Sequence, residues 1–158
     1  MADLKDQIED LFARRSELDP RDGEARAVVD AAIDLLDKGE VRVAEHGPDG
    51  EVIVHQWLKQ AILLLFTLTQ METIELGPFE YADKIALKSD YQAQGVRVVP
   101  GASARVGSFL DRGVVMMPSY VNIGARVGAN TMVDTWATVG SCAQIGANVH
   151  LSGGVGIG

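Results

Sequence analysis

The chain is poor in the residues from which many functional sites are built. It has one cysteine, Cys142, and three histidines among 158 residues. A single cysteine excludes a disulfide within the chain and a zinc site made of cysteines. The three histidines are far apart in the sequence, so no metal site is expected. Cys142 has no histidine at a spacing that suggests a catalytic dyad, and we interpret it as an inert thiol.

Positive charge and long apolar runs are scarce as well. The chain has 14 Lys and Arg against 22 Asp and Glu, a net charge of −8 at pH 7. Nucleic acids and anionic membrane surfaces attract Lys and Arg, so neither is expected as a partner. The longest apolar run, residues 61–68, is too short to cross a membrane, and the N-terminus does not resemble a signal peptide. These absences predict a cytoplasmic protein.

What the chain does have is a six-residue repeat over about its last fifty residues. A period of six fits neither a helix nor a simple alternating strand, and it is typical of a parallel β-helix. Three hexads would form one triangular coil of about 18 residues. The first position of each hexad is apolar throughout: Phe109, Val115, Val121, Val127, Val133, Val139, Ile145, Leu151 and Ile157.

The first half of the chain reads differently. Apolar residues at helical spacing predict helices over residues 2–18, 23–37 and 56–70, and two alternating runs around Gly47-Pro48-Asp49-Gly50 predict a β-hairpin. We therefore expect an α+β chain: a helical N-terminal domain with a β-hairpin over 1–72, an irregular linker over 73–95, and a β-helix over 96–158. A β-helix needs a cap over its last coil, and here the repeat runs to Gly158. We expect the β-helix to be incomplete at its C-terminus and the chain to be a fragment.

Four strings in the chain resemble one enzyme family. They are MPSYVNIGA, TMVDTWATVGSCAQIGANVHLSGGVGIG, RVAEHGPDGEVIVHQWLKQAILLLF and GVRVVPGASARVGSF. By these strings the chain resembles the tetrahydrodipicolinate N-succinyltransferases, which are members of the hexapeptide-repeat acyltransferase superfamily. The resemblance implies a homotrimer in which each subunit has a helical N-terminal domain, a left-handed β-helix and a C-terminal cap.

The same resemblance implies an activity. The family transfers succinyl from succinyl-CoA to the amino group of a ring-opened amino-dicarboxylate, in the succinylase branch of diaminopimelate and lysine biosynthesis. Succinyl-CoA is then a co-substrate, and no permanently bound cofactor is expected. The CoA-binding residues and a second catalytic carboxylate, a glutamate, are expected beyond residue 158.

Asp134 is the candidate catalytic residue. The second hexad position is glycine at 128, 140, 146 and 158, where we expect a corner that needs positive φ. One column of stacked positions, Met116, Asp134 and Ser152, has no glycine. A carboxylate there could orient an amine and accept its proton before attack on a thioester. The alternative is that Asp134 only caps its own turn, and which of the family's two carboxylates is the base stays open.

Arg97 and Ser141 are the candidate substrate-binding residues, together with Asp134. By resemblance, Arg97 matches an arginine that contacts a substrate carboxylate, for which a bidentate guanidinium is suited; the alternative is that it covers the end of the first coil. Ser141 could hydrogen-bond the same substrate. His150 ends its hexad at a corner, where other hexapeptide acyltransferases have a histidine as general base. Because the surrounding motif resembles the succinyltransferases instead, we interpret His150 as structural.

A different function class remains open. The chain could be another hexapeptide-repeat protein, either a different acyltransferase or a non-catalytic trimeric β-helix. A carbonic-anhydrase-like member would need three histidines on a zinc ion, and only His150 lies in the repeat.

Overall fold

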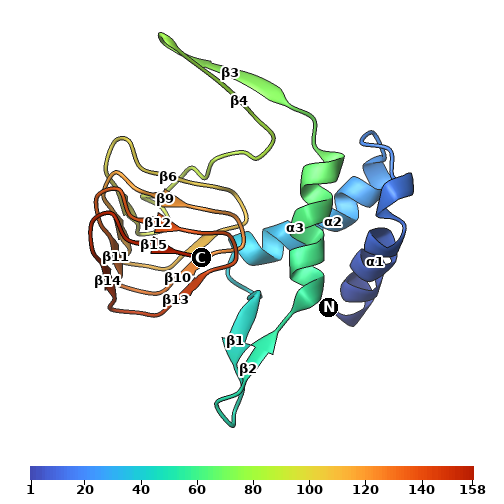
Figure 1. Ribbon diagram of the computed structural model, residues 1–158, viewed down its shortest axis with the longest axis horizontal. Coiled ribbons are helices and arrows are strands. Elements are labelled where there is room, and N and C mark those ends of the chain that lie inside the picture. The colour runs from blue at the N-terminus through green and yellow to red at the C-terminus, as the bar shows by residue number, and fades with distance from the viewer.

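Three helices form the first packed region of the computed structural model, which describes residues 1–158 (Figure 1). They are α1 (Ala2–Ala13), α2 (Gly23–Asp37) and α3 (Gln56–Leu68), with a short 3-10 turn, η1 (Arg15–Glu17), after α1. Asp22 caps α2 by accepting a hydrogen bond from the backbone N–H of Ala25 at 2.9 Å. None of the helices is both long and apolar enough to cross a membrane.

Two antiparallel hairpins flank α3. The first, β1 (Ala44–His46) with β2 (Val52–Val54), confirms the predicted hairpin. The second, β3 (Glu72–Leu76) with β4 (Phe79–Asp83), lies where the sequence predicted only irregular linker, so that prediction was wrong for these residues. Gly77 takes φ +59° in the two-residue turn and lets the strands reverse. Figure 1 shows this hairpin as an arm that projects away from the body.

The second region is a parallel β-solenoid of two-residue strands, stacked on the left of Figure 1. Its eleven strands form three sheets, in the orders β14-β11-β8-β5, β15-β12-β9-β6 and β13-β10-β7. The predicted hexapeptide β-helix is thus confirmed. The strands are β5 (Arg97–Val98), β6 (Ser103–Ala104), β7 (Phe109–Leu110), β8 (Val115–Met116), β9 (Tyr120–Val121), β10 (Arg126–Val127), β11 (Met132–Val133), β12 (Thr138–Val139), β13 (Gln144–Ile145), β14 (His150–Leu151) and β15 (Gly156–Ile157).

The repeat frame changes once along the solenoid. Leu110 and Met116 fill the interior, 2% and 0% exposed, whereas the predicted frame had put Phe109 and Val115 there. Val133 pairs with Met116, seventeen positions earlier, and with Leu151, eighteen positions later. The side of the triangle between Met116 and Val121 is therefore five residues long instead of six. The predicted frame was correct from Val121 onward and wrong by one residue before it.

The left-handed backbone corner also differs from the prediction. Positive φ occurs at the fourth position of the hexad, not the second. Trp136, Cys142 and Asn148 take φ of 62°, 66° and 57°, although none of them is glycine. The second-position glycine has another reason: a Cβ on Gly128 would lie 2.5 Å from the backbone of Gly146 in the next coil. Close stacking of the coils, rather than positive φ, requires glycine there.

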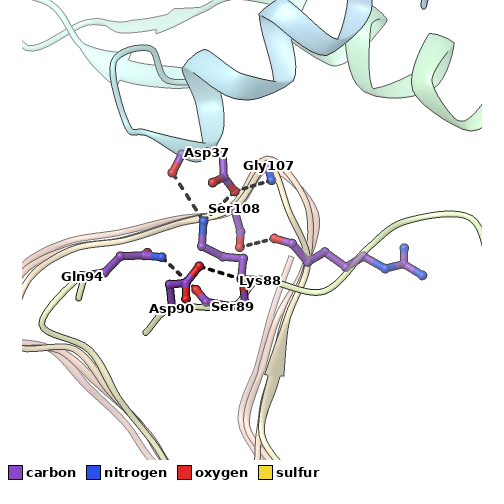
Figure 2. A network of polar contacts seen from close by, with 8 residues as sticks. Asp37, Lys88, Ser89, Asp90, Gln94, Gly107 and Ser108 are labelled. Carbon is purple, nitrogen blue, oxygen red and sulfur yellow. Dashed lines mark hydrogen bonds and ion pairs between the residues drawn. The ribbon is translucent and has the colours of Figure 1, made fainter. Parts of the chain in front are cut away.

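A buried ion pair joins the helical region to the solenoid (Figure 2). The Lys88 ammonium, with 2% of its side chain exposed, lies 2.5 Å from Asp37 Oδ1 at the end of α2. The same carboxylate oxygen accepts the backbone N–H of Gly107, at a corner of the first coil, at 2.7 Å. Gly107 has φ +84°, and a Cβ on it would meet Ile123 at 2.8 Å. The first coil can approach α2 this closely because that position is glycine.

Candidate functional site

The candidate site lies on the outer face of the sheet β14-β11-β8-β5. Val133 and Leu151 point into the solenoid and are buried. Their neighbours along the chain therefore point outward, because side chains alternate along a strand. Met132 pairs with His150 in register, which sets His150 one coil from Asp134 on the same outer face.

Both oxygens of Asp134 are held. Its Oδ2 lies 3.0 Å from His150 Nε2. Its Oδ1 accepts the backbone N–H of Thr135 at 2.7 Å and the Thr135 hydroxyl at 3.3 Å. The hydrogen bond from His150, followed by that from the Thr135 N–H, lowers the pKa of Asp134 below its ordinary value. Asp134 is therefore a carboxylate at neutral pH, able to accept a hydrogen bond from an amine.

Arg97 lies on the same sheet as Asp134. Arg97, Val115, Met132 and His150 form one row across β5, β8, β11 and β14. Two strand spacings, roughly 10 Å of backbone, separate Arg97 from the Met132 position. Arg97 is exposed and makes no side-chain hydrogen bond or ion pair in the structure. One face of one chain thus presents a free guanidinium and an anchored carboxylate.

Ser141 lies elsewhere. It follows β12, whereas Asp134 precedes β12, so the two residues stand at different corners of the triangle. The next residue, Cys142, packs against the core of the helical region, and burial raises the pKa of its thiol. Within one chain the structure does not bring Ser141 to Asp134.

The column that singled out Asp134 needs one correction. Met116 was placed in it, but Met116 is fully buried in the interior, and Met117 is the neighbour of Asp134 in the preceding coil. The N–H of Met117 bonds to the carbonyl of Val133, and that of Asp134 to the carbonyl of Leu151. With Met117 in place of Met116, the column still contains no glycine.

His150 is the residue that the sequence analysis undervalued. A signal for it was present: one coil spans eighteen residues here, so residue 150 stacks on residue 132, two positions before Asp134 on the same face. With the expected coil length of 18 residues, the imidazole of His150 can be placed beside the carboxylate of Asp134 from the sequence.

The three main hollows of the single chain are not lined by Asp134. Two of about 380 and 420 Å³ lie where the helical region meets the solenoid, and neither is lined by Asp134, Arg97 or Ser141. A smaller one, of about 150 Å³, lies beside the Asp134 turn and is lined in part by Ser119 and Trp136. Small-molecule sites are usually concave, and none of these three hollows includes the Asp134 carboxylate.

Known proteins give a consistent match. Residues 3–68 match the family model described as tetrahydrodipicolinate N-succinyltransferase N-terminal. The whole chain aligns with proteins named 2,3,4,5-tetrahydropyridine-2,6-dicarboxylate N-succinyltransferase. Identity is 54% to that of Idiomarina loihiensis and 54% to that of Acinetobacter baylyi, in each case over 60% of the relative's length. The relative from Chelativorans sp. is 50% identical over 59% of its length.

The chain therefore spans about three fifths of the length of these relatives. The match runs through both regions of the fold and includes the strings around Asp134 and Arg97. Over its whole length the chain is therefore similar to the tetrahydrodipicolinate N-succinyltransferases, and its first helical region matches the N-terminal model of that family.

Proposed function

We propose that the full-length protein transfers a succinyl group from succinyl-CoA to the amino group of ring-opened tetrahydrodipicolinate, in the succinylase branch of diaminopimelate and lysine biosynthesis. The observation that carries the proposal is the Asp134 carboxylate, held outward on the same face as the free Arg97 guanidinium. The names of the relatives supply the reaction.

The reaction requires a proton acceptor for the amine and a cation that binds a substrate carboxylate. An alkylammonium must lose a proton before its nitrogen can attack the thioester carbon; the C–N bond then forms, the C–S bond breaks and the CoA thiolate takes up a proton. Asp134 hydrogen-bonds the amine, orients it and can receive or relay its proton. Arg97 pairs with a carboxylate of the substrate through its guanidinium. The CoA site and the second carboxylate would lie in the part of the full-length protein that corresponds to the stretch of the relatives this chain does not span.

We also propose that the site lies between subunits of a homotrimer. The face around Asp134 is open in the single chain, and Ser141 stands at a different corner of the triangle. A neighbouring copy could close the face and supply its own Ser141 to the substrate held by Asp134 and Arg97. Closed cyclic symmetry would give three identical sites. The cytoplasmic location stays a prediction.

Asp134→Asn in the full-length protein tests the proposal. The change removes the proton acceptor but keeps a side chain of the same shape, so kcat/KM for succinyl transfer should fall roughly 10²–10⁴-fold. Asp111→Asn is the matched control. Asp111 also begins a corner and accepts the N–H of the next residue, Arg112, at 2.7 Å, but it has no histidine partner and lies at another corner.

The two variants separate catalysis from turn capping. If Asp134 only caps its turn, both variants should lose similar amounts of stability and activity. If Asp134 acts on the amine, only Asp134→Asn should lose activity while its melting temperature stays close to that of the Asp111→Asn control. A wild-type full-length protein that transfers no succinyl would favour the second candidate function, a different hexapeptide-repeat protein.

A further inference from the structure

We propose that His150 is a positioning residue that fixes the Asp134 carboxylate in its working orientation. This inference rests on the proposed function, since it assigns His150 a part in the same site. It starts from the 3.0 Å contact between His150 Nε2 and Asp134 Oδ2.

The direction of the hydrogen bond follows from the two groups. An ionised carboxylate only accepts, so the imidazole must donate through Nε2–H. Oδ1 is taken by the Thr135 N–H at 2.7 Å. The two bonds hold different oxygens from different coils, one from the residue next in sequence and one from β14. Together they fix both torsions of the Asp134 side chain, and a lone pair of the carboxylate remains free to accept from the amine.

His150 is the one side chain that hydrogen-bonds Asp134 Oδ2 in the structure. Of the groups on the outer face of this sheet, only Arg97, Asp134 and His150 are charged or titratable, and Arg97 lies three strands from His150. The other outward neighbours include Val115, Met117 and Met132, which offer no strong donor, and Ser152, whose hydroxyl makes no hydrogen bond to Asp134 in the structure. His150 is 59% exposed at its side chain, and Asp134 is 31% exposed. The pair is therefore accessible to a substrate, and without His150 the Oδ2 atom would be hydrogen-bonded by mobile water.

The test uses four variants of the full-length protein. His150→Leu removes the donor and keeps the bulk. His150→Gln keeps an N–H donor on a side chain of similar reach. Asp134→Asn/His150→Leu combines the loss of both partners. His46→Leu removes an exposed imidazole from the β1–β2 hairpin, where its one hydrogen-bond contact is with the carbonyl of Gly50 at 3.4 Å.

His150→Leu should lower kcat about 10–100-fold, the factor expected for losing a hydrogen bond to a charged group, with a smaller change in KM. His150→Gln should recover most of this loss, and His46→Leu should behave as wild type. The double variant should be no slower than Asp134→Asn alone, because His150 acts only through Asp134. The proposal would be overturned if the fold losses in kcat of the two single variants multiplied in the double variant. It would also be overturned if His150→Gln were as slow as His150→Leu.

A crystal structure of full-length His150→Leu gives a readout that does not depend on activity. Asp134 should adopt another rotamer or two conformers, while the wild-type crystal shows one. An Asp134 side chain that stays in place without His150 would overturn the positioning role. If the wild-type protein transfers no succinyl, the proposed function fails, and the rotamer comparison still decides what His150 does to Asp134.

Discussion

At the scale of single residues, the conformation of the fourth hexad position sets a local stability cost. Asn148 is exposed and has φ 57°, a region that costs a residue with a Cβ roughly 1–2 kcal/mol and that glycine adopts freely. Asn148→Ala should therefore lower the free energy of unfolding by about 1 kcal/mol more than Asn148→Gly does. Both variants lose the same weak contact with Asn130, so their difference in urea unfolding isolates the backbone term. Equal stabilities would show that the corner tolerates a Cβ.

The buried ion pair should show a much larger effect. Asp37→Asn leaves the buried Lys88 ammonium without its counter-charge, and we expect a loss of about 3–5 kcal/mol in the free energy of unfolding. Asp34→Asn is the control on the same helix: its pair with Lys38 is 57% exposed at both side chains, so its loss should stay below about 1 kcal/mol. Denaturant unfolding of both variants measures the difference. Similar losses would mean that Lys88 finds another partner or reaches water.

The sequence was informative about some residues and silent about others, for physical reasons. Asp134 was found because a carboxylate interrupts a position otherwise rich in glycine. The partnership with His150 needs the coil offset as well as the residue types, and it was missed. Asp37 and Lys88 could not be paired in advance, because 51 positions separate them and their contact depends on how α2 docks on the first coil.

At the scale of elements, the helices and the hexads were predictable because they repeat a local pattern. α2 has the predicted bounds, and the solenoid strands follow the apolar positions from Val121 onward. The β3–β4 arm was missed although its sequence carries a hairpin signal: Ile74, Leu76, Phe79 and Tyr81 alternate with polar residues on both sides of Gly77-Pro78. The five-residue side was missed since a shift of one residue leaves apolar residues available in both frames.

The arm should be nearly neutral for the stability of this 158-residue chain. Leu76 and Phe79 at its tip are 66% and 61% exposed. Replacing either with serine should change the free energy of unfolding by less than about 0.5 kcal/mol. Leu65→Ser on α3, where the side chain is 4% exposed, should cost at least about 3 kcal/mol. A tip variant as costly as Leu65→Ser would show that the arm packs against another surface in solution.

At the scale of the whole molecule, the proposed site between copies can be tested by mixing subunits. Asp134→Asn and Ser141→Ala should each lower the activity of the full-length protein. If Asp134 of one copy works with Ser141 of the next, random mixed trimers would hold about a quarter of their sites intact. The activity of the mixture should then exceed the mean of the two parents. Activity equal to the mean of the two parents would place both residues in the same copy.

The five-residue side has a consequence for how anything can align along the solenoid. A stack of identical coils presents the same surface after a shift of one coil. A molecule bound along its edge could therefore bind one coil higher or lower with similar contacts. The turns of the Asp134 corner are four residues long at 99–102, 134–137 and 152–155, and only the turn at 117–119 is three. That short turn lies directly beside Trp136, whose backbone N–H donates to the Pro118 carbonyl. The edge next to Asp134 therefore has one turn that differs from the others. A ligand or a second chain that fits this turn can bind at one position along the solenoid instead of several.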